Sequence, residues 1–120
     1  MKRVLLVNDH NLFRQSLAVV LKHRTDFKEN IQAGSLVGAR QILADRDGRF
    51  DLAIVDLDLP EGGATDLIHK LHEFDIPVLA LTVGQNLEGR TRALPAGANK
   101  VLNIASDEEI VSVVNRLISE

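Results

Sequence analysis

The chain has 120 residues, of which 45% are hydrophobic, and its 14 basic and 17 acidic residues give a formal net charge of −3. This length and hydrophobic content suit one globular domain and exclude a disordered chain. The absence of cysteine excludes disulfides, thiolate metal sites and a cysteine nucleophile. The acidic balance and the 3% aromatic content leave no basic or base-stacking surface for nucleic acid.

The sequence shows no segment suited to membrane insertion or secretion. The first apolar run, residues 4–7, is interrupted at Asn8, whereas a signal peptide needs a longer apolar stretch and a small-residue cleavage site. No run approaches the roughly 18 apolar residues of a bilayer-spanning helix. We therefore expect a cytoplasmic protein without membrane contact.

The first half of the chain alternates apolar runs with segments of helical period. Residues 4–7 predict a buried strand, and the next apolar residues recur at helical intervals. A weaker strand at 31–33 precedes Ser35, a residue suited to cap a second helix. The side chains expected to face the core are Phe13, Leu17, Val20 and Leu21 in the first helix, and Val37, Ile42 and Leu43 in the second.

The second half continues the alternation. Strong strands are predicted at 52–55 and 78–81, followed directly by Asp56 and Thr82, and a short strand at 100–103. A helix separates the first two of these strands, and a weak helix at 87–94 separates the last two. The final helix begins at a capping box, Ser-Asp-Glu-Glu. The expected core positions are Leu67, Ile68 and Leu71 in the third helix, and Ile110, Val113, Val114, Leu117 and Ile118 in the last.

Five consecutive strand–helix units predict an α/β fold with a doubly wound, five-stranded parallel sheet. Strands that read as continuous apolar runs are buried on both faces, as in a parallel sheet covered by helices. No linker or repeat interrupts the pattern, so we expect residues 1–120 to form one domain with no room for a second.

The polar residues that follow the strands indicate where the chemistry lies. Ligands of open parallel sheets bind beyond the carboxyl ends of the strands, where Asp9, Asp56 and Thr82 would converge. Clustered carboxylates repel one another unless a cation lies among them, and Mg²⁺ prefers such oxygen ligands. An ionised aspartate beside Mg²⁺ can attack a phosphoryl group. The pattern therefore favours a magnesium site that forms an aspartyl phosphate.

Four segments carry a resemblance to a known family. Residues 4–14, VLLVNDHNLFR, resemble the first strand, acidic pair and first helix of the receiver domain of bacterial two-component response regulators. The run from His10 to Leu17 looks most like the NarL/LuxR-type subgroup of this family. Residues 51–60 resemble its phosphoacceptor strand and loop. Residues 79–82 and 96–102 resemble its fourth strand and the approach to its fifth. The resemblance implies a flavodoxin-like (βα)5 fold.

The resemblance also implies roles for individual residues. Asp56 would accept the phosphoryl group from a sensor histidine kinase, and Thr82 would donate a hydrogen bond to it. Mg²⁺ would be bound by Asp9, by Asp56 and by the backbone carbonyl of Asp58, with Asn8 holding it indirectly through water. His10, which commonly begins the first helix in this subgroup, is interpreted as structural.

Three positions depart from the family pattern. Asn8 replaces the first acid of the acidic pair, which predicts weak Mg²⁺ binding. Ile104 stands where the family has a lysine that pairs with the phosphoryl group. Val101 stands where the family has an aromatic switch residue. We doubt that Lys100 substitutes for the lysine, and Arg90 or Arg92 could do so only if their helix swung inward. The domain is therefore predicted to be an atypical receiver.

The function predicted from these residues is signalling rather than enzymatic. Phosphorylation of Asp56 would regulate an attached or partner output, in particular transcription, through a homodimer formed by the fourth helix, fifth strand and fifth helix. DNA would be contacted only by an output domain absent from this chain. A variant of this hypothesis is a phosphorylation-independent interaction module, since Val101 and Ile104 both weaken switching.

A second hypothesis is a small phosphatase of the haloacid-dehalogenase type. Asp56-Leu57-Asp58 matches the Asp-x-Asp motif of those enzymes, with Asp56 as the nucleophile. The position of the motif far from the N-terminus, the short chain and Pro60 all weigh against this alternative.

Overall fold

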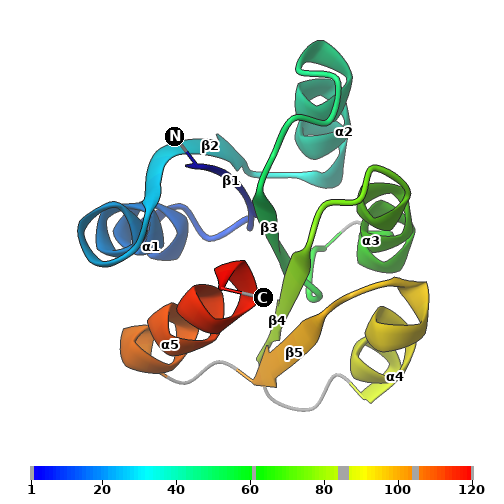
Figure 1. Ribbon diagram of the computed structural model, residues 1–120. Helices are drawn as coiled ribbons and strands as arrows, with labels where there is room; N and C mark the ends of the chain where they lie inside the picture. The colour runs from blue at the N-terminus through cyan, green and yellow to red at the C-terminus, as the bar shows by residue number, and fades with distance from the viewer. Residues whose placement is uncertain (1, 61, 84–86, 104–105, 120) are drawn as a thin grey trace.

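The computed structural model describes residues 2–60, 62–83, 87–103 and 106–119. Strands and helices alternate strictly along these residues (Figure 1). The elements are β1 (Lys2–Val7), α1 (Asn11–Arg24), β2 (Phe27–Ala33), α2 (Leu36–Asp45), β3 (Leu52–Asp56), α3 (Ala64–Glu73), β4 (Val78–Thr82), α4 (Leu87–Ala96), β5 (Lys100–Asn103) and α5 (Asp107–Ile118).

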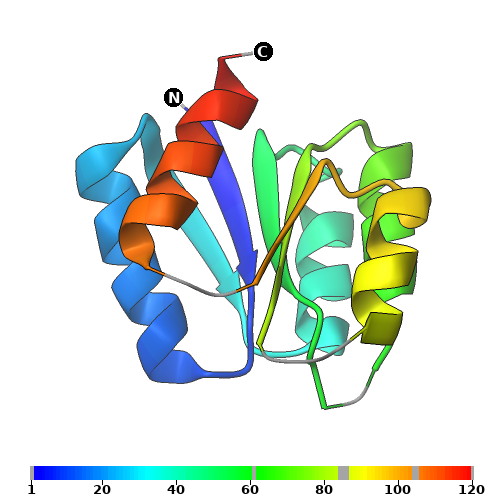
Figure 2. The same ribbon diagram turned by 90° about the horizontal axis from the view of Figure 1, so that it is seen from below.

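The five strands form one parallel sheet in the order β2-β1-β3-β4-β5. Helices α1 and α5 cover one face, and α2, α3 and α4 cover the other (Figures 1 and 2). This is the doubly wound α/β architecture predicted from the sequence. The strand order places β3 at the centre of the sheet, so the residue that ends β3 lies in the middle of the carboxyl edge.

Two hydrophobic cores hold the layers together, one on each face of the sheet. In β1, Val4 and Leu6 face the core under α1 and α5, whereas Leu5 and Val7 face the core under the other three helices. Alternation across the sheet explains this division, because successive side chains of a strand point to opposite faces. Both faces are covered, and this is why β1 reads as a continuous apolar run.

The predicted helix caps and most of the predicted core positions are confirmed. Ser35 and Ser106 are the N-caps of α2 and α5, and their hydroxyl oxygens accept hydrogen bonds from the backbone N–H groups of Gly38 and Glu109. Helix α3 is the clearest case, because Leu67, Ile68 and Leu71 are all fully buried, as predicted.

The prediction that Val37 is a core residue is wrong. Its side chain is 64% exposed, and the buried residues of α2 are Ala39 and Leu43. Val37 lies two residues before Ala39, a rotation of ~200° about the helix axis, so the two side chains point in nearly opposite directions. The side chain that α2 buries at this point is the small Ala39, which is fully buried.

Strand β2 is longer than the predicted 31–33. It begins at the buried Phe27 and pairs with β1 as far as Ala33, with an irregularity in the register at Lys28, although Lys28, Glu29 and Asn30 are polar. Pairing with β1 therefore overrides the weak local preference of these residues for extended structure.

Within the described residues, no helix combines the length and apolarity that crossing a bilayer requires.

Replacement of one core leucine should measure how much the α3 layer contributes. Leu67 is completely buried, and we expect Leu67→Ala to lower the free energy of unfolding by about 2–5 kcal/mol, because it removes buried methyl groups and leaves a cavity. Leu12→Ala is the matched control, since Leu12 is 86% exposed and its loss should cost at most about 0.5 kcal/mol. Urea unfolding of the two variants measures both values, and equal effects would contradict the packing described here.

Candidate functional site

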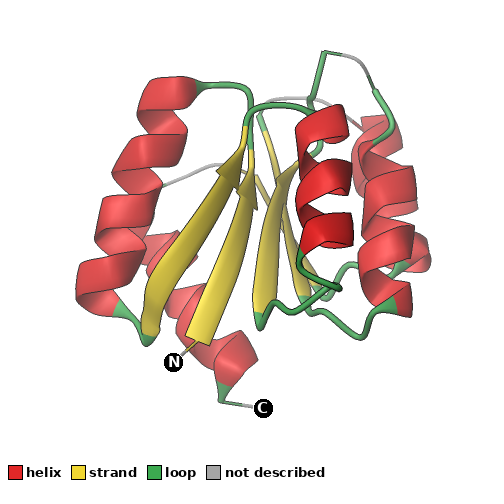
Figure 3. Cartoon of the chain, turned by 90° about the horizontal axis from the view of Figure 1, so that it is seen from above, coloured by secondary structure: helices red, strands yellow, loops and turns green. Residues whose placement is uncertain are grey.

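The residues predicted to carry the chemistry lie at the carboxyl edge of the sheet, the upper edge in Figure 3. Asn8 and Asp9 follow β1, Asp56 ends β3 and Thr82 ends β4. Asn8, Asp56 and Thr82 are polar residues in a buried setting, with exposed fractions of 5%, 3% and 0%. Burial costs free energy for polar groups that have no partner, so each of these side chains should have a hydrogen-bond or charged partner at the site.

Two carboxylates and one imidazole converge at this edge. One oxygen of Asp9, one oxygen of Asp56 and one ring nitrogen of His10 all lie within 4.8 Å of one another. The Asp9 Oδ1 atom is buried and has no hydrogen-bond partner; the ring Nε2 of His10 lies 3.7 Å from it, beyond hydrogen-bond range. An orphaned carboxylate oxygen beside a second carboxylate is the group that a hard divalent cation satisfies. These residues therefore fit Mg²⁺.

The sequence predicts a structural role for His10, and its position in the structure adds a second contact. It is the residue before α1, but its side chain makes no capping hydrogen bond and instead joins the two carboxylates. The only sequence signal was its place directly after an acidic residue at a strand end.

Asp56 is held in a setting that opposes its ionisation. Burial raises the pKa of the Asp56 carboxyl above its ordinary value, and the neighbouring charges of Asp58 and Asp9 raise it further. Two influences act in the opposite direction: the backbone N–H of Asp58 donates to Asp56 Oδ1 at 2.9 Å, and His10 lies nearby. The net direction is upward, so ionised Asp56 is a high-energy group that a cation would stabilise.

Asp58 links the loop after β3 to the end of β4 through its side chain. The Thr82 hydroxyl donates to the Asp58 carboxylate, at 3.2 Å to Oδ2 and 3.4 Å to Oδ1, and the backbone N–H of Val83 donates to Oδ2 at 2.8 Å. The sequence predicts a role for Asp58 only through its backbone carbonyl, and it predicts that Thr82 donates to the phosphoryl group. The Asp58 side chain is therefore a site residue that sequence reasoning missed.

The loop after β1 is held in place by its own hydrogen bonds. Asn8 Oδ1 accepts the backbone N–H of His10 at 2.8 Å, so this side chain closes a turn at the end of the strand. The guanidinium of Arg14 donates to the backbone carbonyl of Asn8 and to the side chains of Asn11 and Gln32. Arg14 thus ties the loop that carries Asp9 to α1 and β2.

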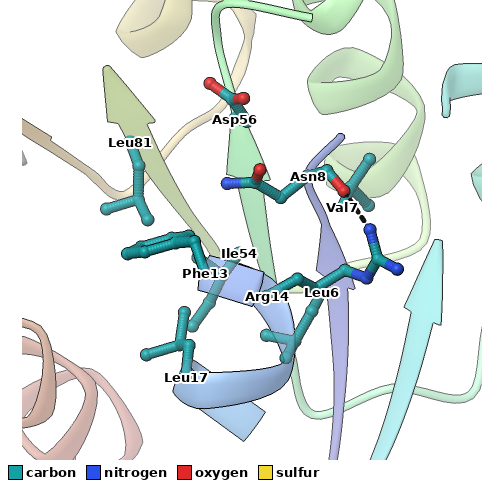
Figure 4. A pocket seen from close by; sticks show the side chains of 9 residues that line it. All are labelled: Leu6, Val7, Asn8, Phe13, Arg14, Leu17, Ile54, Asp56 and Leu81. Carbon is teal, nitrogen blue, oxygen red and sulfur yellow. Dashed lines mark hydrogen bonds between the residues drawn. The ribbon is translucent and has the colours of Figure 1, made fainter. Parts of the chain in front are cut away.

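A small cavity of about 10 Å³ lies beneath this edge, on the α1 face of the sheet (Figure 4). Its volume is at the lower limit of what one water molecule needs. Polar groups of Asn8 and Asp56 meet apolar side chains of Phe13, Ile54 and Leu81 there. The Asp56 residue thus borders both the polar edge of the sheet and the apolar layer beneath it.

Among the expected departures from the family pattern, Ile104 lies outside the described residues, whereas Val101 lies within them. Val101 is half-buried against the core on the α2, α3 and α4 face. Lys100 pairs in register with Leu79, three residues back from the end of β4, so it lies away from the carboxyl edge. This agrees with the expectation that Lys100 does not replace the missing lysine.

The comparisons with known proteins agree with this geometry. Residues 4–115 match the family model of the response regulator receiver domain. The chain belongs to this family. Five parallel strands, five helices and the acidic cluster at the carboxyl edge are thus the parts of a receiver domain, and the resemblance noted in the sequence is confirmed.

Individual relatives are similar over most of this chain. The virulence transcriptional regulatory protein PhoP of Salmonella choleraesuis is 33% identical over 104 residues, which are 82% of this chain and 43% of PhoP. A CheY-like receiver domain from Methanospirillum hungatei has a TM-score of 0.88 at 21% identity, covering 99% of this chain and 94% of its own. A response regulator from Burkholderia pseudomallei has a TM-score of 0.81 at 26% identity, covering 99% and 69%.

These relatives decide between the two hypotheses of the sequence analysis. The family and the curated relatives belong to two-component signalling, and the phosphatase alternative finds no support among them. Receiver domains are signalling domains. The chain spans less than half of the length of the curated relatives named PhoP and KdpE. The assignment to the NarL/LuxR-type subgroup stays a prediction.

The raised pKa of Asp56 predicts a pH-dependent gain in stability when its charge is removed. In the unfolded chain the pKa of Asp56 has the ordinary value of 3.8, whereas the folded protein keeps the proton to a higher pH. Ionisation of Asp56 therefore costs free energy in the folded state. This cost develops as the pH rises above 3.8, and it persists at higher pH. Asp56→Asn should therefore raise the free energy of unfolding of metal-free protein at neutral pH, and the gain should disappear in acid.

Urea unfolding over a pH series, with a chelator present, measures this gain. Asp26→Asn is the matched control, because Asp26 is exposed and lies outside the cluster. A gain that is absent at neutral pH, or largest in acid, would contradict the account of Asp56.

Proposed function

We propose that this chain receives a phosphoryl group on Asp56 from a sensor histidine kinase and thereby regulates an output domain or partner. One observation carries the proposal: Asp56, the buried end of the central strand, meets Asp9 within 4.8 Å in a chain of the receiver family. The combination provides a nucleophile, a place for a cation and a position that a partner protein can reach at the edge of the sheet.

In the proposed reaction, an oxygen of Asp56 attacks the phosphorus of a phosphohistidine. The new O–P bond forms as the P–N bond breaks, and the imidazole keeps the electron pair and takes up a proton. Because Asp56 Oδ1 accepts the N–H of Asp58, the carboxylate is held at a fixed angle and Oδ2 is assigned as the nucleophile. The chain contributes mainly positioning to this step.

Mg²⁺ would be held by Asp9, by Asp56 and by the backbone carbonyl of Asp58, with Asn8 acting through water. When bound, it supplies positive charge that offsets the repulsion between the two carboxylates and the incoming phosphoryl group. The Burkholderia pseudomallei response regulator supports this proposal, since its structure contains a phosphorylated aspartic acid and a calcium ion.

The output is proposed to lie outside this chain. The relatives PhoP and KdpE are transcriptional regulatory proteins, which supports transcription as the regulated process and DNA contact by an output domain. We place the protein in the cytoplasm for the same reason. An open groove of about 560 Å³ between α4 and β5, lined in part by Arg90, Leu94 and Val101, supports homodimerisation through the α4, β5 and α5 face.

Magnesium titration tests the cation site. We expect Mg²⁺ to bind in the millimolar range or more weakly, because Asn8 supplies no charge to the outer shell. Asn8→Asp should tighten binding about 10- to 100-fold, the usual effect of an outer-shell change, and Asp9→Asn should weaken it by at least as much. Calorimetry or NMR titration gives the affinities, and an unchanged affinity in Asp9→Asn would show that Asp9 is not a ligand.

A small phosphodonor tests the acceptor. With Mg²⁺ and acetyl phosphate, intact-mass measurement should show slow gain of one phosphoryl group in the wild type and in the control Asp26→Asn, and none in Asp56→Asn. Size-exclusion chromatography with light scattering should show little change in oligomeric state on phosphorylation, because Ile104 cannot pair with the phosphoryl group. Labelling of Asp56→Asn at the wild-type rate would refute the assignment of the acceptor, and a large phosphate-dependent shift would refute the weak switching.

A further inference from the structure

We infer that the Asp58 carboxylate is a positioning group that competes with the phosphoryl group on Asp56 for the same two donors, the Thr82 hydroxyl and the Val83 backbone N–H. This inference rests on the proposed function of Asp56. It assigns to the Asp58 side chain a role separate from the backbone carbonyl that would hold the metal. Asp58 would therefore set how readily the site accepts and retains a phosphoryl group.

The contacts of Asp58 carry the inference. Its Oδ2 atom accepts both the Thr82 hydroxyl, at 3.2 Å, and the Val83 N–H, at 2.8 Å. Its own backbone N–H meanwhile donates to Asp56 Oδ1 at 2.9 Å. One residue thus connects the nucleophile at the end of β3 to the end of β4, with its backbone on one side and its side chain on the other.

Each of these donors has one proton to give. A threonine hydroxyl and a backbone amide each carry a single hydrogen, so a proton given to Asp58 is not available to another acceptor at full strength. A phosphoryl group on Asp56 brings three acceptor oxygens and close to two negative charges to this edge. Two anions would then stand side by side and require the same donors, which favours displacement of the Asp58 carboxylate.

The bonds of the Asp58 backbone and side chain are separate. Its backbone N–H donates to Asp56, whereas its carboxylate accepts from Thr82 and Val83, so the proposed exchange concerns the side-chain bonds. Val83 is the first residue after β4, so this exchange of acceptors changes what holds the chain as it leaves the sheet. With the aliphatic Ile104 in place of a lysine, Thr82 and Val83 matter more to the phosphoryl group than in a typical receiver.

The first test examines the contact itself in metal-free protein. Asp58→Ala removes the acceptor, so hydrogen exchange of the Val83 amide should accelerate about tenfold, the equivalent of one hydrogen bond. Asp58→Asn retains a side-chain oxygen at the same place and should keep most of the protection. Asp26→Ala is the control and should leave Val83 unchanged. Equal exchange of Val83 in the wild type and Asp58→Ala would overturn the inference.

The second test measures competition with a phosphoryl mimic, the beryllium trifluoride anion. Titrations are made with Mg²⁺ saturating for each variant, because loss of the Asp58 charge also changes metal affinity. Asp58→Ala should bind the mimic at least about tenfold more tightly than the wild type, since both donors become available. Asp58→Asn should lie between the two, because its amide lacks the charge but still competes for the donors.

The outcomes separate the inference from the proposed function. Binding that requires Asp56 but is not strengthened in Asp58→Ala would overturn the competition and leave the acceptor role intact. Equal strengthening in Asp58→Ala and Asp58→Asn would also overturn it, because the effect would then come from charge alone. Failure of every variant to bind the mimic, with Val83 exchange responding as expected, would overturn the acceptor role of Asp56 and the competition with it. Thermal unfolding establishes that each variant is folded.

Discussion

The placement of one carboxylate at the end of the central strand governs the rest of this structure. Asp56 follows four buried apolar residues of β3 and is itself buried, so its charge is costly in the folded state. The doubly wound sheet creates this cost, because helices cover both faces and β3 has neighbours on both sides. The Asp58 N–H and the adjacent His10 relieve the cost in part, whereas Asp9 and Asp58 increase it. Positive charge at this edge would therefore stabilise ionised Asp56, as the proposed function requires.

The two loops that surround Asp56 are stabilised in different ways. The loop after β1 is tied down by backbone-directed hydrogen bonds: Asn8 closes a turn and Arg14 binds the Asn8 carbonyl. The ends of β3 and β4 are joined instead by a side chain, that of Asp58, through Thr82 and Val83. Both sets of bonds involve side chains, but the bonds of the β1 loop hold that loop to α1, whereas the Asp58 bonds connect the ends of two neighbouring strands. The inferred exchange of acceptors would therefore act on the connection between β3 and β4.

The expected departures from the family pattern concern three residues: Asn8, Val101 and Ile104. The sequence predicts that Asp9, Asp56 and Thr82 retain the residue types of a receiver. Asn8 removes charge but keeps a polar side chain that orders the loop. Val101 packs against the core and has no large ring to reorient. If the proposed function holds, such a domain would keep its nucleophile, and its response to phosphorylation would depend on the remaining residues of the site.

The sequence by itself determined the order of strands and helices, the parallel sheet and the edge at which Asp9, Asp56 and Thr82 meet, because periodicity and strand ends are local properties of the chain. Tertiary structure alone decided three other features. Strand β2 extends over polar residues because β1 pairs with it, and α2 buries Ala39 rather than Val37, a choice between two apolar residues that depends on how the helix packs on the sheet. The Asp58 side chain binds Thr82, a residue 24 positions away, and no local pattern encodes that contact. Hydrogen bonds between loops depend on where the folded strands bring those loops, so they could be recognised only once the fold was known.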